Sequence, residues 1–289
     1  MKHIISLLFI VTAIHVATAQ EDLMDLIDKE SSTDLTFVDQ TFKGTRLING
    51  HSIETRKKGV LDVIISHRFG TLNSGAYELF GLDESNVRLG ADFGVTDRFN
   101  IGVGRNSFEK TFDGFLKYKI LRQRPGTTPL SVVGFSSAAL KTLKTGDPAG
   151  EPDLSSRMAY THQLIVARKF SSSFSFQISP TLVHRNSVAE DEDPNDIYAL
   201  GAGGRIKLTK RVSLNAEYYY QFNTVEDSPM MNSVAIGFDI ETGGHVFQLH
   251  FTNSRAMIEK GFITETTGDF FDGDIHFGFN ISRTFQLYE

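Results

Sequence analysis

The sequence contains no cysteine, which excludes several kinds of site before any pattern is considered. Without thiols there is no disulfide framework, no thiolate metal site, no cysteine nucleophile and no lipid-modified N-terminal cysteine. Tryptophan is also absent, so any aromatic belt must be built from 24 phenylalanine and 8 tyrosine side chains. After residue 20 no apolar run approaches the ~20 residues that a membrane-spanning helix needs. The mild formal charge of −6 gives no support for nucleic-acid binding, which usually needs a basic face.

The chain is instead rich in alternation between apolar and polar residues, most clearly in residues 274–287. Phe277 and Phe279 fall on one side of an extended chain, and His276 and Asn280 fall on the other, because side chains in a strand alternate with period two. One face suits hydrocarbon and the other suits water. A hydrophobic share of 40% is too low for a bundle of membrane helices, but it is typical of a barrel wall in which apolar residues occupy every second position.

The same alternation predicts about twelve strands. They are expected at residues 60–68, 86–95, 99–105, 112–121, 130–140, 160–168, 174–184, 197–208, 212–222, 233–241, 246–252 and 274–287. Short connections such as 96–98 and 209–211 alternate with long ones such as 141–159 and 253–273. Bacterial membrane barrels have short periplasmic turns and longer outer loops, whereas a soluble β-sandwich has no reason to alternate loop lengths.

The predicted fold is therefore all-β: a single transmembrane antiparallel up-and-down β-barrel of about 12 strands at residues 59–289, with a short N-terminal extension at residues 20–58. Residues 1–19 have a basic start at Lys2, an apolar stretch and small residues at Ala17 and Ala19, which predicts a signal peptide cleaved after Ala19 and export to the bacterial outer membrane. The alternative, an uncleaved anchor, is disfavoured because the apolar run is short and lacks a cationic stop.

The N-terminal extension contains two predicted elements. Residues 21–30 suit a short amphipathic helix outside the wall, either a solvated lead-in or a docking segment for an unknown periplasmic or outer-membrane protein. Residues 41–55 suit a hairpin, because Asn49-Gly50 tolerates the positive φ of a type I′ turn. This hairpin can plug the lumen, lie in the periplasm or add two wall strands. The first two are favoured, because its faces do not separate into apolar and polar.

Charged residues and histidines lie at the positions that alternation turns inward. This predicted lumen lining consists of Asp62, Arg68, Arg88, Asp92, Lys117, Lys119, Arg205, Lys207, Glu217, Asp239, His250 and His276. Charges of both signs on one inner surface can form a selectivity lining for ions or polar solutes. They can equally form a paired network that fills a narrow barrel. Alternation alone leaves both interpretations open.

Other candidate chemistry has simpler explanations. The acidic loops at residues 190–196 and 269–274 offer carboxylates for a hard cation such as Ca²⁺, but neither fits the spacing of a Ca²⁺-binding loop, so solvated loops are favoured. His250 and His276 fall on neighbouring strands and can meet, yet a metal site needs further ligands that the pattern does not provide. No metal site and no cofactor are predicted.

A hydrolytic site at the rim of the barrel is the enzymatic alternative. Ser66, His67 and His184 fall near the outer edge of the predicted wall, but no G-x-S-x-G or comparable motif accompanies them. No catalytic residue is therefore predicted, and the expected protein is not an enzyme.

Two stretches resemble a known family. The sequence T-F-K-G-T-R-L-I-N-G-H-S-I-E-T followed by G-V-L-D-V-I-I-S-H-R-F-G (residues 41–55 and 59–70), together with F-G-F-N-I-S-R-T-F (residues 277–285), resembles an uncharacterised family of Bacteroidota β-barrel proteins classed as a domain of unknown function. The resemblance covers nearly the whole mature chain. It implies an outer-membrane barrel in contact with lipid, and it transfers no catalytic residue.

Two functional hypotheses follow. The first is a passive pore or transporter for small polar solutes, with the inward charges along its path. The second is a closed barrel that serves as a structural or partner-binding platform through its long loops or residues 21–58. The sequence does not decide between an open and a filled lumen.

Overall fold

The chain folds into a closed barrel of twelve antiparallel strands. The computed structural model describes residues 37–146, 150–188, 193–225 and 228–288, so the predicted signal peptide and the predicted helix at residues 21–30 lie outside the described residues. The strands are β1 (Val60–Thr71), β2 (Ser85–Gly94), β3 (Phe99–Asn106), β4 (Phe112–Leu121), β5 (Ser131–Leu140), β6 (Met158–Lys169), β7 (Phe174–Arg185), β8 (Asp196–Lys207), β9 (Val212–Gln221), β10 (Ser233–Thr242), β11 (His245–Thr252) and β12 (His276–Gln286).

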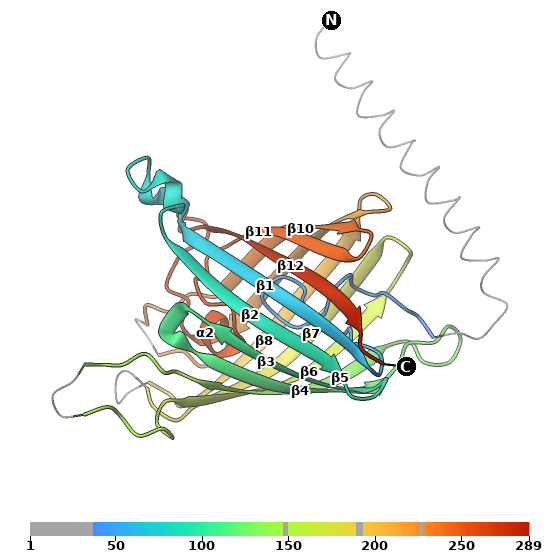
Figure 1. Ribbon diagram of the computed structural model, residues 1–289, viewed down its shortest axis with the longest axis horizontal. Helices are drawn as coiled ribbons and strands as arrows, with labels where there is room; N and C mark the ends of the chain where they lie inside the picture. Colours follow the sequence, from blue (N-terminus) through green and yellow to red (C-terminus); the bar gives the residue numbers. More distant parts are fainter. Residues whose placement is uncertain (1–36, 147–149, 189–192, 226–227, 289) are drawn as a thin grey trace, which may run out of the picture.

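Each strand pairs with its neighbours in the sequence, and the ring closes between the first and last strands (Figure 1). Ile65 of β1, for example, lies opposite Leu89 of β2 on one side and Ile281 of β12 on the other. Closure leaves no unpaired strand edge, which is the condition for a sheet to cross a bilayer. The predicted twelve-stranded antiparallel barrel is confirmed, and the strand boundaries differ from the expected ones by only a few residues.

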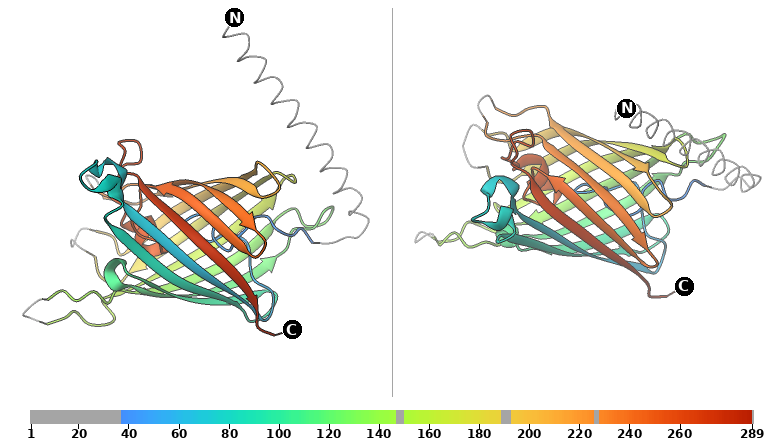
Figure 2. Two further views of the ribbon diagram at one scale, coloured as in Figure 1. Left: turned by 45° about the horizontal axis from the view of Figure 1, so that its top comes forward. Right: turned by 90° about the horizontal axis from the view of Figure 1, so that it is seen from above.

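The two ends of the barrel are unequal (Figures 1 and 2). At the terminal end, where β1 begins and β12 ends, short turns connect the strands. At the opposite end, called here the loop end, the connections are long except between β3 and β4, and they contain the short helices η1 (Leu72–Ser74), η2 (Leu79–Gly81), η3 (Phe108–Lys110) and α2 (Glu259–Thr264). No helix in the described ranges is long and apolar enough to span a bilayer.

Apolar side chains cover the outside of the wall. On β7, the exposed fractions of Phe174, Phe176 and Ile178 are 40%, 37% and 38%, while the intervening serine and glutamine residues are buried inside. Tyr198 and Phe222 are exposed near the loop end, as aromatic residues at a membrane interface are. The outer face of the wall is therefore apolar along the strands.

The interior is filled by the chain itself. Residues 41–53 form a compact hairpin, called here the inner hairpin, which lies within the barrel behind β1 and β12 in Figure 1 (blue). Phe42, Leu47, Ile48 and Ile53 are each at most 2% exposed. From the loop end, α2 also packs inside, with Phe262 and Ile263 fully buried against β7 and β9. The hydrophobic core thus lies inside the ring of strands.

The outward face is testable on a single strand. Replacing Ile178 with Arg puts a charge at the middle of the lipid-facing side of β7, and we expect the free energy of unfolding to fall by about 2–4 kcal/mol. Replacing Phe174 with Arg, on the same face at the end of the strand, should cost only about 0–1 kcal/mol, because the charge can reach the interface. Urea titration in lipid vesicles, followed by the heat-dependent shift of the folded band on gels, measures both. Equal costs would mean that this face does not lie against lipid.

Candidate functional site: the occupied barrel interior

The turn of the inner hairpin differs from the predicted one. Neither Asn49 nor Gly50 has positive φ, so the predicted type I′ turn is wrong. The hairpin is closed by Arg46 pairing with His51 and by the Leu47 amide donating to the Gly50 carbonyl at 2.8 Å, which centres the turn on Ile48 and Asn49. The Gly50 amide points to Glu217 of β9 and the Leu47 carbonyl accepts from Gln248 of β11. Bonds to the wall thus shape the turn.

Glu217 holds this turn through three main-chain hydrogen bonds. Its carboxylate accepts from the amides of Ile48, Asn49 and Gly50 at 3.2, 2.7 and 3.3 Å. Hydrogen bonds to a charged group contribute about 1.5–3 kcal/mol each, and here they offset the cost of burying a carboxylate that is 4% exposed. The turn and Glu217 therefore depend on each other.

Arg68 of β1 holds the turn from another side. Its guanidinium donates to Asn49 Oδ1 at 2.7 Å and to the Ser254 carbonyl at 2.5 Å, and it lies 3.1 Å from His250 Nε2. Asn49 in turn donates to the Thr252 hydroxyl at 3.3 Å. One arginine thus connects the hairpin to β11 and to the chain that follows β11.

The segment 37–58 is bonded or ring-packed to strands all round the barrel. The contacts not yet given, in strand order, are Arg56–Asp62 (β1), Thr45 and Arg46–Asp92 (β2), Arg56–Asn100 (β3), Glu54 carbonyl–Lys117 (β4), His51–Phe135 rings (β5), His51 carbonyl–Gln177 (β7), Thr41 carbonyl–Arg205 (β8), Lys43–Glu241 (β10) and Ile48 carbonyl–Asn280 (β12). Lys169 of β6 donates to the Asp39 carbonyl. With β9 and β11 this makes all twelve strands. A segment that reaches both sides of the bore in this way crosses it.

The contacts are unevenly distributed by type. Towards β4, β5 and β6 the hairpin is apolar: Phe42, Leu47 and Ile53 form one buried cluster with wall residues that include Phe135 and Ile165. Towards β10, β11, β12, β1 and β2 the contacts are ion pairs and hydrogen bonds. Burial of each large apolar side chain stabilises by about 1.5–3 kcal/mol, so the contacts with β4, β5 and β6 hold the hairpin by excluding water.

The chain after β11 packs into one side of the bore at the loop end, against β6, β7 and β9. Phe262 of α2 packs edge-on against Tyr219 of β9 at a ring-centroid distance of 5.0 Å. His51 Nε2 of the hairpin lies 3.6 Å from Glu259 Oε1 of α2, so the two inserted elements meet inside the barrel. From the sequence, residues 253–273 were expected only as a long loop. The apolar runs 256–258 and 262–263 within that loop were the signal that it packs inside.

At the loop end, Glu109 of η3 connects three loops. It forms ion pairs with Lys141, which follows β5, and with Lys260 of α2 at 3.4 Å. Burial acts to raise the pKa of Glu109, but the ammonium groups of Lys260 and Lys141 outweigh it and hold the pKa below its usual value. Glu109 and Lys110 adopt φ of 54° and 51°, a region that costs a non-glycine residue about 1–2 kcal/mol. The ion pairs offset that strain.

The structure places the residues of the predicted lumen lining on the inner side of the wall. Arg88, Asp92, Lys117, Arg205, Glu217, Asp239, His250 and His276 are buried, with exposed fractions of 7% or less, and Lys119 and Lys207, at the ends of their strands, are half-buried. Asp62 pairs with Arg56, and Arg88 pairs with Asp113 of β4, a carboxylate absent from the predicted set. Asp239 accepts from Gln248 at 2.7 Å. The main-chain partners supplied by the hairpin could not be read from alternation.

The candidate histidines and rim residues do not form a site together. His250 contacts Arg68, whereas His276 Nδ1 lies 2.8 Å from the Phe69 carbonyl, so each histidine has its own partner. Ser66 faces inward, and the adjacent His67 faces outward and stacks on Phe279 at 5.0 Å. His184 is bonded to Asp196 at the loop end. Ser66 and His67, on opposite faces of one strand, cannot act as a nucleophile and its base.

The acidic loops show no metal centre among the residues that the structure describes. No group of three or more His, Asp or Glu side chains there could hold an ion. Asp274 accepts hydrogen bonds from the Asp269 amide and the Asn73 side chain, and Asp269 accepts one from the Phe271 amide. These carboxylates order their own loop. Residues 189–192 of the other acidic loop lie outside the described part of the chain.

A closed antiparallel ring with an apolar outer skin and an interior occupied by its own N-terminal segment defines a membrane-bound β-barrel. Residues 42–285 match the family described as "Membrane bound beta barrel domain (DUF5777)", and the chain belongs to that family. The family resemblance is thereby confirmed at the level of the barrel domain. The match begins at Phe42, so it includes the inner hairpin as well as the wall.

Solved barrels share the general fold at low identity. The KdgM porin is 10% identical with a TM-score of 0.47, over 78% of this chain and 99% of that chain. Omp33 of Acinetobacter baumannii is 10% identical with a TM-score of 0.42, over 78% and 97%. Outer membrane phospholipase A of Escherichia coli is 12% identical with a TM-score of 0.42, over 79% and 93%. No curated protein matches the chain. These values carry no argument about function.

The hold of Glu217 on the hairpin can be measured directly. In Glu217→Ala the amides of Ile48, Asn49 and Gly50 lose their acceptor, and we expect their hydrogen exchange to accelerate by at least roughly tenfold. Asp113→Asn is the matched control, because Asp113 is a buried wall carboxylate that pairs with Arg88. Mass spectrometry of exchanged peptides covering residues 41–53 provides the readout. Similar acceleration in both variants would mean that the effect is general loosening of the barrel.

The Glu109 connection predicts a pH dependence. Since the folded pKa of Glu109 is depressed, its ion pairs stabilise the loop end at pH values above its usual pKa, and this contribution is lost as pH falls through the lowered value. The Leu143 amide donates to the Glu109 carbonyl. Its protection from hydrogen exchange, measured relative to the intrinsic rate at each pH, should fall over that window and, in Glu109→Gln, already at neutral pH. Glu84→Gln removes an exposed pair with Arg255 and should change nothing. An unchanged Leu143 amide in Glu109→Gln would contradict the prediction.

Proposed function

We propose that the protein is an outer-membrane barrel that is closed at rest, and that any passage of small polar solutes through it requires displacement of the inner hairpin. The observation that carries the proposal is the set of contacts between the segment 37–58 and all twelve strands. A passive, permanently open pore needs a wetted path, whereas this bore is crossed by a bonded segment. Export rests on the signal-like residues 1–19 and on the alternation of short and long connections.

The energetics favour a closed resting state. Returning Phe42, Leu47, Ile48 and Ile53 to water costs about 1.5–3 kcal/mol each, before any hydrogen bond is counted. A difference of about 5.5 kcal/mol moves a two-state equilibrium from 1:99 to 99:1, so the open form is rare without an input that favours it. Such an input has two natural sources, a ligand or a protein that holds the N-terminal segment.

The second candidate is a closed barrel without transport, a platform whose long loops bind an outer-membrane or periplasmic partner. The ion pairs that join three loops at Glu109 favour a shaped outer surface. The two functions differ in whether the bore ever conducts. Cleavage after Ala19, a Bacteroidota source and the absence of catalysis stay predictions from the sequence.

Conductance tests the proposal. Purified protein in a planar bilayer should give no stepwise current, and a variant lacking residues 37–58 should give steps because the bore loses its filling. Since deletion can also impair folding, Glu217→Ala provides a milder route and should give brief openings in a wall that is otherwise complete. Steady steps from the unaltered protein would overturn closure at rest. If both variants fold and neither gives current, the closed barrel that binds a partner without transport would be favoured.

A reversible tether strengthens the test, and the absence of natural cysteine makes it specific. A Cβ placed at Gly203 of β8 would meet Leu47 Cδ2, so cysteines at positions 47 and 203 are within reach of a disulfide, whose Cβ atoms lie about 3.5–4.5 Å apart. Added to Glu217→Ala, the pair Leu47→Cys and Gly203→Cys should abolish the openings when oxidised and restore them on reduction. Either cysteine alone is the control. Openings that persist in the oxidised pair would show that the current does not depend on hairpin movement.

A further inference from the structure

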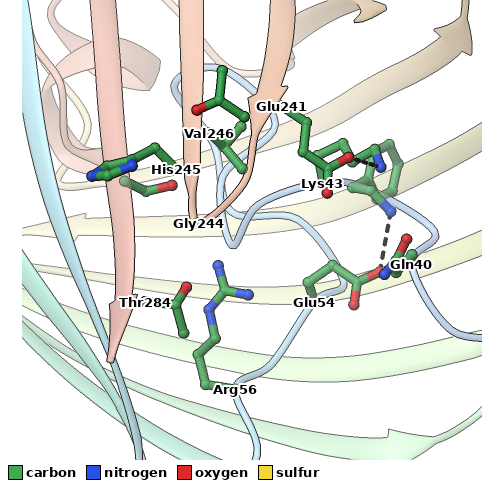
Figure 3. Close-up of a pocket in the computed structure, with 12 residues that line it drawn as sticks. Gln40, Lys43, Glu54, Arg56, Glu241, Gly244, His245, Val246 and Thr284 are labelled. Atoms are coloured by element: carbon green, nitrogen blue, oxygen red, sulfur yellow. Dashed lines mark hydrogen bonds and ion pairs between the residues drawn. The ribbon is translucent and has the colours of Figure 1, made fainter. Parts of the chain in front are cut away.

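The terminal end of the barrel contains a cavity between the inserted segment and the wall. Its volume is ≈ 270 Å³, and it is lined on one side by residues that include Lys43, Glu54 and Arg56 and on the other by the β10–β11 turn and β12 (Figure 3). The cavity lies at the terminal end of the bore, because the β10–β11 turn and the last part of β12 line it. It is large enough for a small organic solute.

The lining carries charges of both signs. Lys43 and Arg56 come from the segment, Glu54 faces them from the same segment, and Glu241 comes from the end of β10. Lys43 pairs with Glu241, Glu54 accepts from the Phe42 amide at 3.1 Å, and Arg56 pairs with Asp62. These bonds use part of each group's capacity, since an ammonium has three donors and a guanidinium has five. Their remaining donors and acceptors suit a solute with a similar mixture of charges.

A second, smaller cavity continues the same sector further into the barrel. Its volume is ≈ 20 Å³, and it shares Val246 and Ser282 with the first. Its other lining residues are mostly polar, among them Arg46, Asp62 and Asn280. The space between hairpin and wall therefore lies on the side of β10, β11, β12 and β1, opposite the apolar contacts with β4, β5 and β6.

We propose that the terminal-end cavity is a binding site for small dipolar solutes, molecules that carry one positive and one negative group, such as a free amino acid. The anionic group binds beside Lys43 and Arg56, and the cationic group binds beside Glu241 and Glu54. A solute with a single charge meets an opposite charge but also a like one, which costs it affinity. The evidence for the binding site is the geometry of the cavity alone. A further role of this site, as the entrance for solutes that pass through the bore, rests on the proposed function.

Protection of an introduced cysteine tests the site. Ser282→Cys places the one thiol of the protein in the lining, and a methanethiosulfonate reagent applied in detergent should modify it. Glycine should slow this modification at least tenfold, whereas acetate or methylammonium at equal concentration should slow it much less. Ala167→Cys is the matched control near the same end of the barrel on β6, where the inward side chain is 1% exposed in the apolar cluster. Its modification should be slow and indifferent to all three solutes.

The charges can then be removed while the cavity stays. In Ser282→Cys combined with Lys43→Met and Glu241→Gln, protection by glycine should weaken by roughly tenfold or more, because each end of the solute loses a partner. Equal protection by glycine, acetate and methylammonium, or none by any of them, would overturn the dipolar site. If the hairpin deletion conducts but glycine gives no protection, this inference fails and the proposed function stands. If glycine protects the cysteine but no variant conducts, the binding site is supported and the proposed passage of solutes through the bore is not.

Discussion

A narrow barrel must provide a partner for every charge that its wall turns inward. Here the inner hairpin provides many of them, and it does so largely with main-chain groups. Glu217 accepts three backbone amides, while Lys117, Gln177, Arg205, Gln248 and Asn280 donate to backbone carbonyls of the same short segment. A buried charge without a partner costs several kcal/mol, so wall and hairpin stabilise one another and neither is complete alone.

The inner hairpin contacts the wall in two different ways on its two sides. Towards β4, β5 and β6 the hairpin packs as the core of a soluble protein does, by excluding water from Phe42, Leu47 and Ile53. Towards β10, β11, β12 and β1 it is held by directional bonds next to small hydrated spaces. Directional bonds can be exchanged for bonds to water or to a solute with little net change, whereas apolar burial cannot. In the proposed opening of the bore, the polar side of the hairpin is therefore expected to separate first.

The wall was predictable from the sequence because its signal is local. Strand alternation has period two, so a run such as residues 274–287 shows it over a few consecutive residues. The position of the hairpin was not predictable in the same way, because its partners lie far away in the chain: Glu217 is 168 positions from Asn49. The type I′ expectation failed for this reason, since local turn preference was overridden by bonds to β9 and β11. The inward turn of α2 was missed because apolar residues in a long loop do not reveal which surface they cover.

The ring has a single closing seam, where β12 meets β1, and the polar side of the hairpin faces that seam. The strands that give the hairpin its apolar support, β4 to β6, lie across the bore from the seam. A break at the seam would therefore expose the hydrated side of the hairpin and leave its apolar contacts in place.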